Sequence, residues 1–299
     1  MGTALTAPVR GNAERRSQTV KVDFYKVRDE GIGRIEFRNA LRAAMRLHGV
    51  NRSRDVWGER VDLYVCHESG SIIEGEIGRV RMNDTPAIAN RDCSVNEISL
   101  DDGQGIAERT AFLYDSQRAV LALHAKREAV SASRIAGFCN HFSGNEIESF
   151  SLNPILRTDA EQKFRSMDVI KKVEVEYFRG AGDIIANSDI STSSFVRSLE
   201  TLQGETLTVA VSSGRKKRNR LSLGHVRELI QTALTGRDEV VRKLTISGRN
   251  ASDEALFIDL LEDRLRTPVL IEVRGRTASY EQRRRAVRRA YESNLSLLQ

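Results

Sequence analysis

Cysteine and long apolar runs are both scarce in this sequence, and each absence excludes a class of protein. The 299 residues contain three cysteines, Cys66, Cys93 and Cys139, which are odd in number and far apart. This spacing argues against a disulfide framework and against a paired CxxC metal site, so reduced thiols are expected. No apolar stretch approaches the roughly 18 to 20 residues that span a membrane, and the N-terminus lacks the apolar core of a signal peptide. The sequence therefore predicts a cytoplasmic protein that is not itself transmembrane.

Acidic residues are too few in the last third of the chain to balance the basic ones. The chain has a formal net charge of +6. Residues 205–299 hold 19 Lys and Arg against 12 Asp and Glu, so this third carries the whole positive excess. Local clusters of one sign create binding surfaces for the opposite sign. The asymmetry predicts a contiguous basic surface matched to nucleic acid or to an acidic membrane surface.

The pattern of apolar residues divides the chain into three parts. Residues 1–19 are polar, small and basic without periodicity, which predicts a disordered basic tail. Residues 20–150 predict a β-rich N-terminal domain of successive hairpins, one of which turns at residues 116–118, with an amphipathic helix at 131–142. Residues 151–299 predict a mixed α/β basic region that binds DNA.

Beyond residue 150 strands and helices alternate to the end of the chain. The sequence predicts strands at 169–178, 207–213, 241–248 and 268–275, helices after Thr158 and at 193–203, 221–234 and 252–265, and a long C-terminal helix at 278–298. Because strands and helices are mixed and the first half is hairpin-like, the predicted fold class is α+β rather than a doubly wound parallel sheet.

Five of the six residues from 215 to 220 are permanently cationic. This segment, RKKRNR, follows the apolar run TLTVAVS and precedes LSLGHVRELIQTAL, which predicts a surface turn between a strand and a helix. Like charges crowded on one turn repel each other unless an anion screens them, and duplex DNA carries a phosphate for about every 1.7 Å of axis. An isolated charged turn is often only solvated, but this density and the charge asymmetry favour phosphate binding. The predicted DNA-binding residues of the turn are Arg215, Lys216, Lys217, Arg218 and Arg220.

The C-terminal helix carries the second basic cluster. Residues 279–282 have the spacing of a capping box at its start. At about 100° per residue, Arg285 and Arg289 project together from the side opposite the apolar stripe and are predicted to contact DNA phosphates. The alternative is a solubilising face in which they pair with Glu281 and Glu292. The predicted buried stripe consists of Tyr280, Val287, Tyr291, Leu295 and Leu298.

Catalytic and metal-binding patterns are weak throughout. The five histidines are dispersed, and the glycine pairs lack the spacing of phosphate loops, so no catalytic residue, cofactor site or metal site is assigned. The strongest enzymatic alternative is a metal-dependent nuclease built from Asp259, Asp263 and Glu272. Its third element continues into Arg274, which stays protonated where a catalytic lysine is expected and so cannot act as a general base. The sequence therefore predicts a protein that is not an enzyme.

The order of these segments from about residue 60 onward resembles the RexA family of phage superinfection-exclusion proteins. The likeness lies in VDLYVCHESGSII, in FLYDSQRAVLALHAKREAVSASRIAGF, in VIKKVEVEYF, GDIIANSDI and ETLTVAVSSGRKKRNRLSLGHVRELI, and in LTISGRNASDEALFIDLLED with the helix that follows. The N-terminal tail and the GRNASDE segment have no counterpart. The resemblance implies a fold like that of the recombination-associated protein RdgC, a homodimer, nonspecific duplex binding and a membrane-protein partner encoded alongside. Of the family's functional residues, only the basic stretch at 215–220 is matched to this sequence, and that match is by position.

Charge and resemblance together predict a sequence-nonspecific double-stranded DNA-binding protein of a phage exclusion or abortive-infection system. Neither basic cluster has the Asn, Gln and Arg arrangement of a recognition helix, which agrees with binding that ignores sequence. Two alternatives stay open. One is the nuclease effector, and the other is an adaptor that binds anionic membranes or an acidic protein in preference to DNA.

Overall fold

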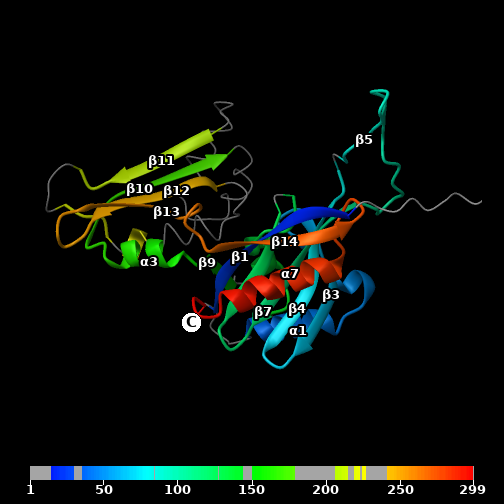
Figure 1. Ribbon diagram of the computed structural model, residues 1–299, viewed down its shortest axis with the longest axis horizontal. Helices are drawn as coiled ribbons and strands as arrows, with labels where there is room; N and C mark the ends of the chain where they lie inside the picture. The colour runs from blue at the N-terminus through cyan, green and yellow to red at the C-terminus, as the bar shows by residue number, and fades with distance from the viewer. Residues whose placement is uncertain are drawn as a thin grey trace, which may run out of the picture.

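The computed structural model of the chain contains two larger antiparallel β-sheets with helices packed on them (Figure 1). This arrangement confirms the predicted α+β fold class. The residues that the structure describes are 15–29, 36–83, 85–126, 128–143, 150–178, 206–214, 219–222, 224–226 and 241–298. None of the helices in these ranges is long and apolar enough to cross a membrane.

The first sheet has eight strands in the order β14-β1-β8-β7-β4-β3-β2, with β9 paired to the end of β1. Its longest strand, β1, lies next to the edge strand β14 and pairs with β14, β8 and β9, and all of these pairings are antiparallel. The strands are β1 (Arg15–Asp29), β2 (Ser53–Val56), β3 (Glu59–Ser69), β4 (Ile72–Arg81), β7 (Ile106–Asp115), β8 (Val120–Ala125), β9 (Phe150–Pro154) and β14 (Arg266–Arg274).

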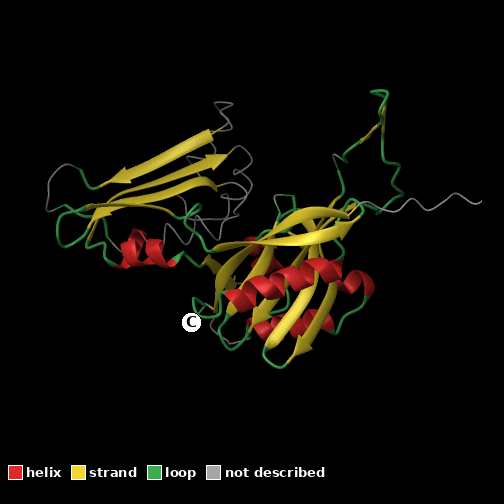
Figure 2. Cartoon of the chain, viewed as in Figure 1, coloured by secondary structure: helices red, strands yellow, loops and turns green. Residues whose placement is uncertain are grey.

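Helices cover both faces of this sheet (Figure 2). α7 (Tyr280–Ser293) packs on one face, and α1 (Phe37–Met45) and α2 (Ala132–Asn140) pack on the other, where the short 3-10 helix η1 (Gly49–Arg52) follows α1. Successive side chains of a strand point to opposite faces, so β1 contributes residues to the core on each face of the sheet. Even-numbered residues from Val20 to Phe24 enter the core beneath α7, while Tyr25 and Val27 enter the core beneath α1 and α2.

The second sheet has four strands in the order β11-β10-β12-β13. Valines and isoleucines from one of its faces pack with residues of α3, among them Ala160, to form a separate core. A two-stranded ribbon of β5 (Ile88–Ala89) and β6 (Val95–Asn96) lies between β4 and β7 in sequence. The elements of the second sheet are α3 (Thr158–Arg165), β10 (Val169–Phe178), β11 (Thr206–Ser212), β12 (Val241–Arg249) and β13 (Ala255–Asp259).

Several predicted elements are confirmed with close boundaries. β10 spans 169–178 as predicted, and α3 follows at Thr158 as expected. The predicted hairpin with a turn at 116–118 is β7 and β8. α2 begins after Ser131, whose side chain accepts a hydrogen bond from the backbone of Arg134 and so acts as the N-cap.

The predicted helix at 252–265 is wrong, because its first half is the strand β13. The apolar residues there also alternate with period two, and Ile258 is buried while its neighbour Phe257 is exposed. The turn before the strand is closed by Asn250, whose side chain accepts from the backbone N–H of Glu254 at 2.9 Å. This turn brings β13 alongside β12, and the resulting ladder outweighs the local helical pattern.

The predicted boundaries of tail and domains do not follow the sheets. β1 already begins at Arg15, since residues 15–19 pair with β14, so the last part of the predicted tail is strand. The sequence assigned β14 and α7 to the second region. In the structure β14 is a strand of the first sheet, and α7 packs on that sheet (Figure 1). The predicted helix at 193–203, and most of the one at 221–234, lie outside the described residues.

Candidate functional site

α7 begins at a complete capping box, as the spacing of residues 279–282 predicts. Ser279 Oγ accepts from the N–H of Gln282 at 3.3 Å, and Gln282 Oε1 accepts from the N–H of Ser279 at 2.8 Å. The same side chain donates from Nε2 to the backbone oxygen of Glu272 at 2.6 Å. The start of α7 is therefore tied to the end of β14, where several basic residues gather.

Three arginines on the inner side of α7 pair with two buried carboxylates of β4. Arg284 Nη1 donates to Glu74 at 2.9 Å, Arg288 Nε donates to the same carboxylate at 2.8 Å, and Arg283 donates to Glu76. Glu74 and Glu76 are only 5% and 1% exposed. Burial alone would raise the pKa of Glu74, but the hydrogen bonds and charges of Arg288 and Arg284 outweigh it and lower this pKa.

These pairs remove Arg283, Arg284 and Arg288 from the predicted basic surface. The sequence counted all three as surplus charge, because their carboxylate partners lie more than 200 residues away. The expectation that the whole C-terminal excess forms one exterior surface is therefore wrong. Part of that charge holds α7 on the sheet.

The predicted buried stripe of α7 is confirmed except at Leu295, and Leu298, beyond the end of the helix, is buried as predicted. Val287 and Tyr291 are buried and Tyr280 is partly buried, but Leu295 is 37% exposed. α7 ends at Ser293, so the rotation of about 100° per residue no longer holds beyond it.

Arg285 and Arg289 lie on the outer side of α7 and are exposed, as predicted. Neither forms an ion pair with another residue in the described ranges, and Glu281, a proposed alternative partner, pairs with Arg284 instead. Arg285 borders a depression of about 530 Å³, which we call the α7 basin. The α7 basin is lined by Arg15, Glu272, Arg274, Ser279, Glu281, Gln282 and Arg285.

β1 and β14 run side by side as an antiparallel ribbon (Figure 1). Exposed cations lie at both ends of one face of this ribbon. The register places Arg15 opposite Arg274 at one end. At the other end Lys21 is two positions from the Asp23–Arg266 pair. Six residues separate Arg15 from Lys21, which corresponds to about 20 Å at 3.3 Å per residue. We call this surface the ribbon face, formed by Arg15, Ser17, Thr19, Lys21, Arg266, Pro268, Leu270, Glu272 and Arg274, all of which are exposed.

One carboxylate interrupts the ribbon face. Glu272 lies 3.8 Å from Arg15, and the two side chains are 76% and 66% exposed. An ion pair this open to water contributes little free energy, so it does not prevent Arg15 from meeting another anion.

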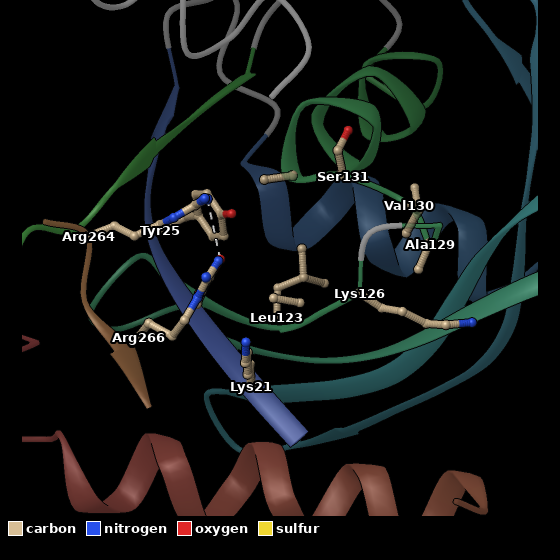
Figure 3. A pocket seen from close by; sticks show the side chains of 12 residues that line it. Lys21, Tyr25, Leu123, Lys126, Ala129, Val130, Ser131, Arg264 and Arg266 are labelled. Atoms are coloured by element: carbon tan, nitrogen blue, oxygen red, sulfur yellow. Dashed lines mark hydrogen bonds and ion pairs between the residues drawn. The ribbon is translucent and has the colours of Figure 1, made fainter. Parts of the chain in front are cut away.

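A pocket of about 520 Å³ opens at the Lys21 end of the ribbon face, and we call it the β1–α2 pocket. Figure 3 shows Arg264 and Arg266 on one side of it and residues 129–131, which precede α2, on the other. Arg266 donates from Nε and Nη2 to the two carboxylate oxygens of Asp23 at 2.6 and 2.7 Å, and Arg264 Nη1 lies 3.4 Å from the same carboxylate. The hydrogen bond to Asp23 raises the pKa of Arg266.

Sequence reasoning missed the basic residues of the ribbon face and of the β1–α2 pocket. A partial signal was present, because alternation in RTPVLIEVR places Arg266, Glu272 and Arg274 on one face. Only the pairing with β1 brings Arg15 and Lys21 beside them, and nothing local in the sequence predicts that pairing.

The basic turn of the sequence analysis is described only at its end. Arg215, Lys216, Lys217 and Arg218 lie outside the described residues. Arg220 is exposed, and the next residue donates its backbone N–H to Ile170 O in the second sheet at 3.0 Å. Arg220 therefore extends from the second sheet, whereas Arg285 and Arg289 belong to a helix of the first.

The candidate nuclease carboxylates Asp259 and Asp263 already have hydrogen-bond partners, and Glu272 lies on a different sheet from Asp259. Asp259 Oδ1 accepts from the backbone N–H of Leu261 at 3.0 Å, and Asp263 Oδ1 accepts from Arg157 Nη2 at 2.6 Å. Glu272 is on β14 of the first sheet. Among the described residues, no group of three or more His, Cys, Asp or Glu side chains is placed to hold a metal ion.

Two of the three cysteines, Cys66 and Cys139, pack in or against the apolar core. Cys139 is fully buried in the core under α1 and α2, and Cys66 packs against that core. Burial raises the pKa of the Cys66 thiol to about 12, which disfavours the reactive thiolate.

The family model described as "Family of unknown function (DUF6731)" matches residues 18–296, a range that includes both sheets and α7. No curated protein sequence matches the chain.

Proposed function

The chain belongs to the DUF6731 family, whose function is unknown, and we propose that it binds double-stranded DNA without sequence preference. The observation that carries this proposal is the ribbon face, with exposed cations at both ends. Arg285 adds a further exposed cation at the α7 basin, beside Arg15 and Arg274. The Arg289 side chain lies one helical turn beyond it.

The spacing of the ribbon face favours contacts with phosphates over contacts with bases. Its two basic ends are about 20 Å apart, whereas the major groove of B-DNA is about 12 Å wide. The two ends therefore span more than the width of one groove, so they can meet phosphates on either side of it. Phosphate contacts fix the position of a protein on DNA and carry no direct sequence information.

The affinity of such a surface depends on salt. Each phosphate that a cation neutralises releases condensed counterions, so the slope of log affinity against log salt is about −0.9 per phosphate. If Arg15, Lys21, Arg274 and Arg285 each contact one phosphate, the ribbon face and the α7 basin contribute a slope of about −3.6.

Within this proposal the protein is a cytoplasmic, RexA-like component of a phage exclusion or abortive-infection system. It acts as a homodimer with a membrane-protein partner encoded alongside. The likeness rests on the order of the sequence segments from about residue 60 onward. Light scattering of the purified chain tests the dimer, and a neighbouring gene for a multi-span membrane protein tests the partner.

The deciding experiment is a salt titration of DNA binding, followed by fluorescence anisotropy between about 50 and 200 mM salt. The triple variant Arg15→Ala/Arg274→Ala/Arg285→Ala should bind more weakly and flatten the slope by about 2.7, because three phosphate contacts are lost. Arg165→Ala is the matched control, since Arg165 is an exposed arginine on α3, remote in sequence from the ribbon.

Two duplexes of unrelated sequence should bind equally, and neither should be cleaved when magnesium or manganese is added. A triple variant with the slope of the Arg165→Ala control would refute binding through the ribbon face. Cleavage that depends on the metal would replace the proposal with the nuclease alternative.

A further inference from the structure

The β1–α2 pocket has the size and lining of a small-ligand site. Its volume of about 520 Å³ lies within the range of roughly 300 to 1,000 Å³ that small-molecule sites occupy. Figure 3 shows Leu123 between the arginine side and the α2 side. Together with Ala129 and Val130 it supplies apolar surface suited to the organic part of a ligand.

The charged residues of the pocket leave it with two excess positive charges. Lys21, Arg264 and Arg266 line it, and Asp23 is the one acidic lining residue in the described part of the chain. Lys126 also lines it but forms an ion pair with Glu108, so its charge is already balanced. A phosphomonoester carries about −1.5 to −2 charges at neutral pH, which matches this excess.

The two arginines are held in place before any ligand arrives. Asp23 binds Arg266 through both carboxylate oxygens, which fixes the planar guanidinium and leaves its Nη1 outside that pair. Arg264 Nη1 lies 3.4 Å from the same carboxylate, so Asp23 positions both guanidinium groups.

The start of α2 adds donors on the opposite side. Ser131 Oγ accepts from the N–H of Arg134 at 3.3 Å. Ala132 lines the pocket, and its N–H, in the first turn, has no acceptor within the helix. Such N–H groups and the helix dipole favour an anion at a helix N-terminus.

We propose that the β1–α2 pocket binds the phosphomonoester group of a ligand of mononucleotide size, contacted by Lys21, Arg264 and Arg266. This site goes beyond duplex binding, and of its three cations only Lys21 is also among the residues proposed to contact duplex phosphates. A phosphomonoester can belong to a free nucleotide or to the 5′ end of a DNA strand, and the chemistry recognised is the same.

The test uses the full chain and isothermal titration calorimetry with two ligand pairs. The first pair is adenosine monophosphate and adenosine, and the second is a duplex with 5′-phosphates and the same duplex with 5′-hydroxyls. At least one phosphorylated member should bind about tenfold more tightly than its partner, because only it supplies the anion. Equal affinity within both pairs, or no binding of any ligand, would overturn the proposal.

Lys21→Ala is the first variant, because Lys21 is exposed and its replacement does not disturb the core. It should weaken binding of the phosphorylated ligand about tenfold, with Lys163→Ala, at an exposed position on α3, as the control. Arg264→Ala is the second variant and should have a similar effect, whereas Arg266→Ala is avoided because it would leave Asp23 without its closest partner. If both variants bind the phosphorylated ligand as the control does, the assignment of the pocket is wrong.

The test of the pocket and the test of duplex binding can fail separately. The triple variant at Arg15, Arg274 and Arg285 leaves the pocket residues intact, so it should keep full affinity for adenosine monophosphate while losing duplex affinity. If that variant lost both affinities, the pocket would not bind its ligand independently of the duplex-binding residues.

Discussion

Arg266 and Asp23 join the last strand of the chain to the first, with hydrogen bonds of 2.6 and 2.7 Å between residues 243 positions apart. The Asp23 side chain is 3% exposed and that of Arg266 is 38% exposed. A buried carboxylate is costly unless it is paired, so Asp23 is compensated only when β14 is docked on β1. The pair therefore links the stability of the ribbon to the geometry of the β1–α2 pocket.

Arg266→Ala should destabilise the fold measurably. It leaves Asp23 buried with only the longer contact from Arg264, at 3.4 Å. Breaking a fully buried pair costs about 3 to 5 kcal/mol, but Arg266 is partly exposed, so we expect a loss of about 2 kcal/mol in the free energy of unfolding. Urea unfolding measures it, and Arg165→Ala should stay within about 0.5 kcal/mol of the wild type. A change as small as that of the control would show that water compensates Asp23.

The buried carboxylate of Glu74 should make stability fall in acid. Its pKa in the folded protein is lowered from 4.5, against the effect of burial, by Arg288 and Arg284. The unfolded chain therefore takes up the proton first as the pH falls. The stabilisation is present above pH 4.5 and is lost as the pH drops through the folded pKa.

Glu74→Gln tests this acid dependence. The variant should be less stable than the wild type at neutral pH and should lose less stability between about pH 5 and 3. Chemical unfolding at each pH measures both effects. Parallel curves for the two proteins would show that Glu74 does not titrate between the folded and unfolded states.

His124 should also make stability depend on pH, in a range that begins higher than that of Glu74. Burial, with smaller contributions from Arg283 and Lys126, lowers its pKa from 6.5 to about 4. The unfolded chain binds a proton near pH 6.5 while the folded chain stays neutral, so stability is lost as the pH falls from 6.5 towards 4. The loss reaches about 3 kcal/mol at most. In His124→Asn this part of the pH dependence should vanish, and proton NMR of the wild type should show an imidazole that titrates near 4.

Local pattern predicted much of the fold but not its long-range pairings. Ser131 and the capping box at Ser279 were readable because a helix start depends on residues within one turn. β13 was misread because Leu256, Ile258 and Leu260 alternate as in a strand, while Leu256 and Leu260 also have helical spacing. Its hairpin with β12 decides between the two, and that contact is tertiary.

The candidate site shows the same division. Arg285 and Arg289 were predicted to be exposed from helical periodicity alone, and they are. Arg283 and Arg288 were counted as surplus positive charge because nothing near them in sequence predicts that they pair with Glu76 and Glu74. A count of charges cannot separate a guanidinium that binds a ligand from one that holds a helix on a sheet.

Arg285 and Arg288 should therefore separate binding from stability. Arg285→Ala removes an exposed side chain, so unfolding should change by less than about 0.5 kcal/mol while the salt slope of duplex binding flattens by about 0.9. Arg288→Ala leaves Glu74 with Arg284 alone and should cost about 1 kcal/mol of stability, because Arg288 is partly exposed. Anisotropy titrations and urea unfolding of both variants measure the contrast. Equal effects of the two on duplex binding would mean that α7 acts through its net charge rather than through its outer side.

The basic turn at 215–220 should contribute to duplex binding independently of the ribbon face, because its described end extends from the other sheet. Replacing Arg215, Lys216, Lys217, Arg218 and Arg220 by alanine removes up to five phosphate contacts, so the salt slope should flatten by about 4 to 5. The melting temperature should stay unchanged, since the sequence predicts a surface turn here and side chains in such a turn bury little. If the turn and the ribbon face engage one duplex, the losses in slope of the turn variant and of the Arg15, Arg274 and Arg285 variant should add when the two are combined. Wild-type duplex affinity in the turn variant would remove the turn from the DNA-binding surface and leave the ribbon face as its remaining candidate.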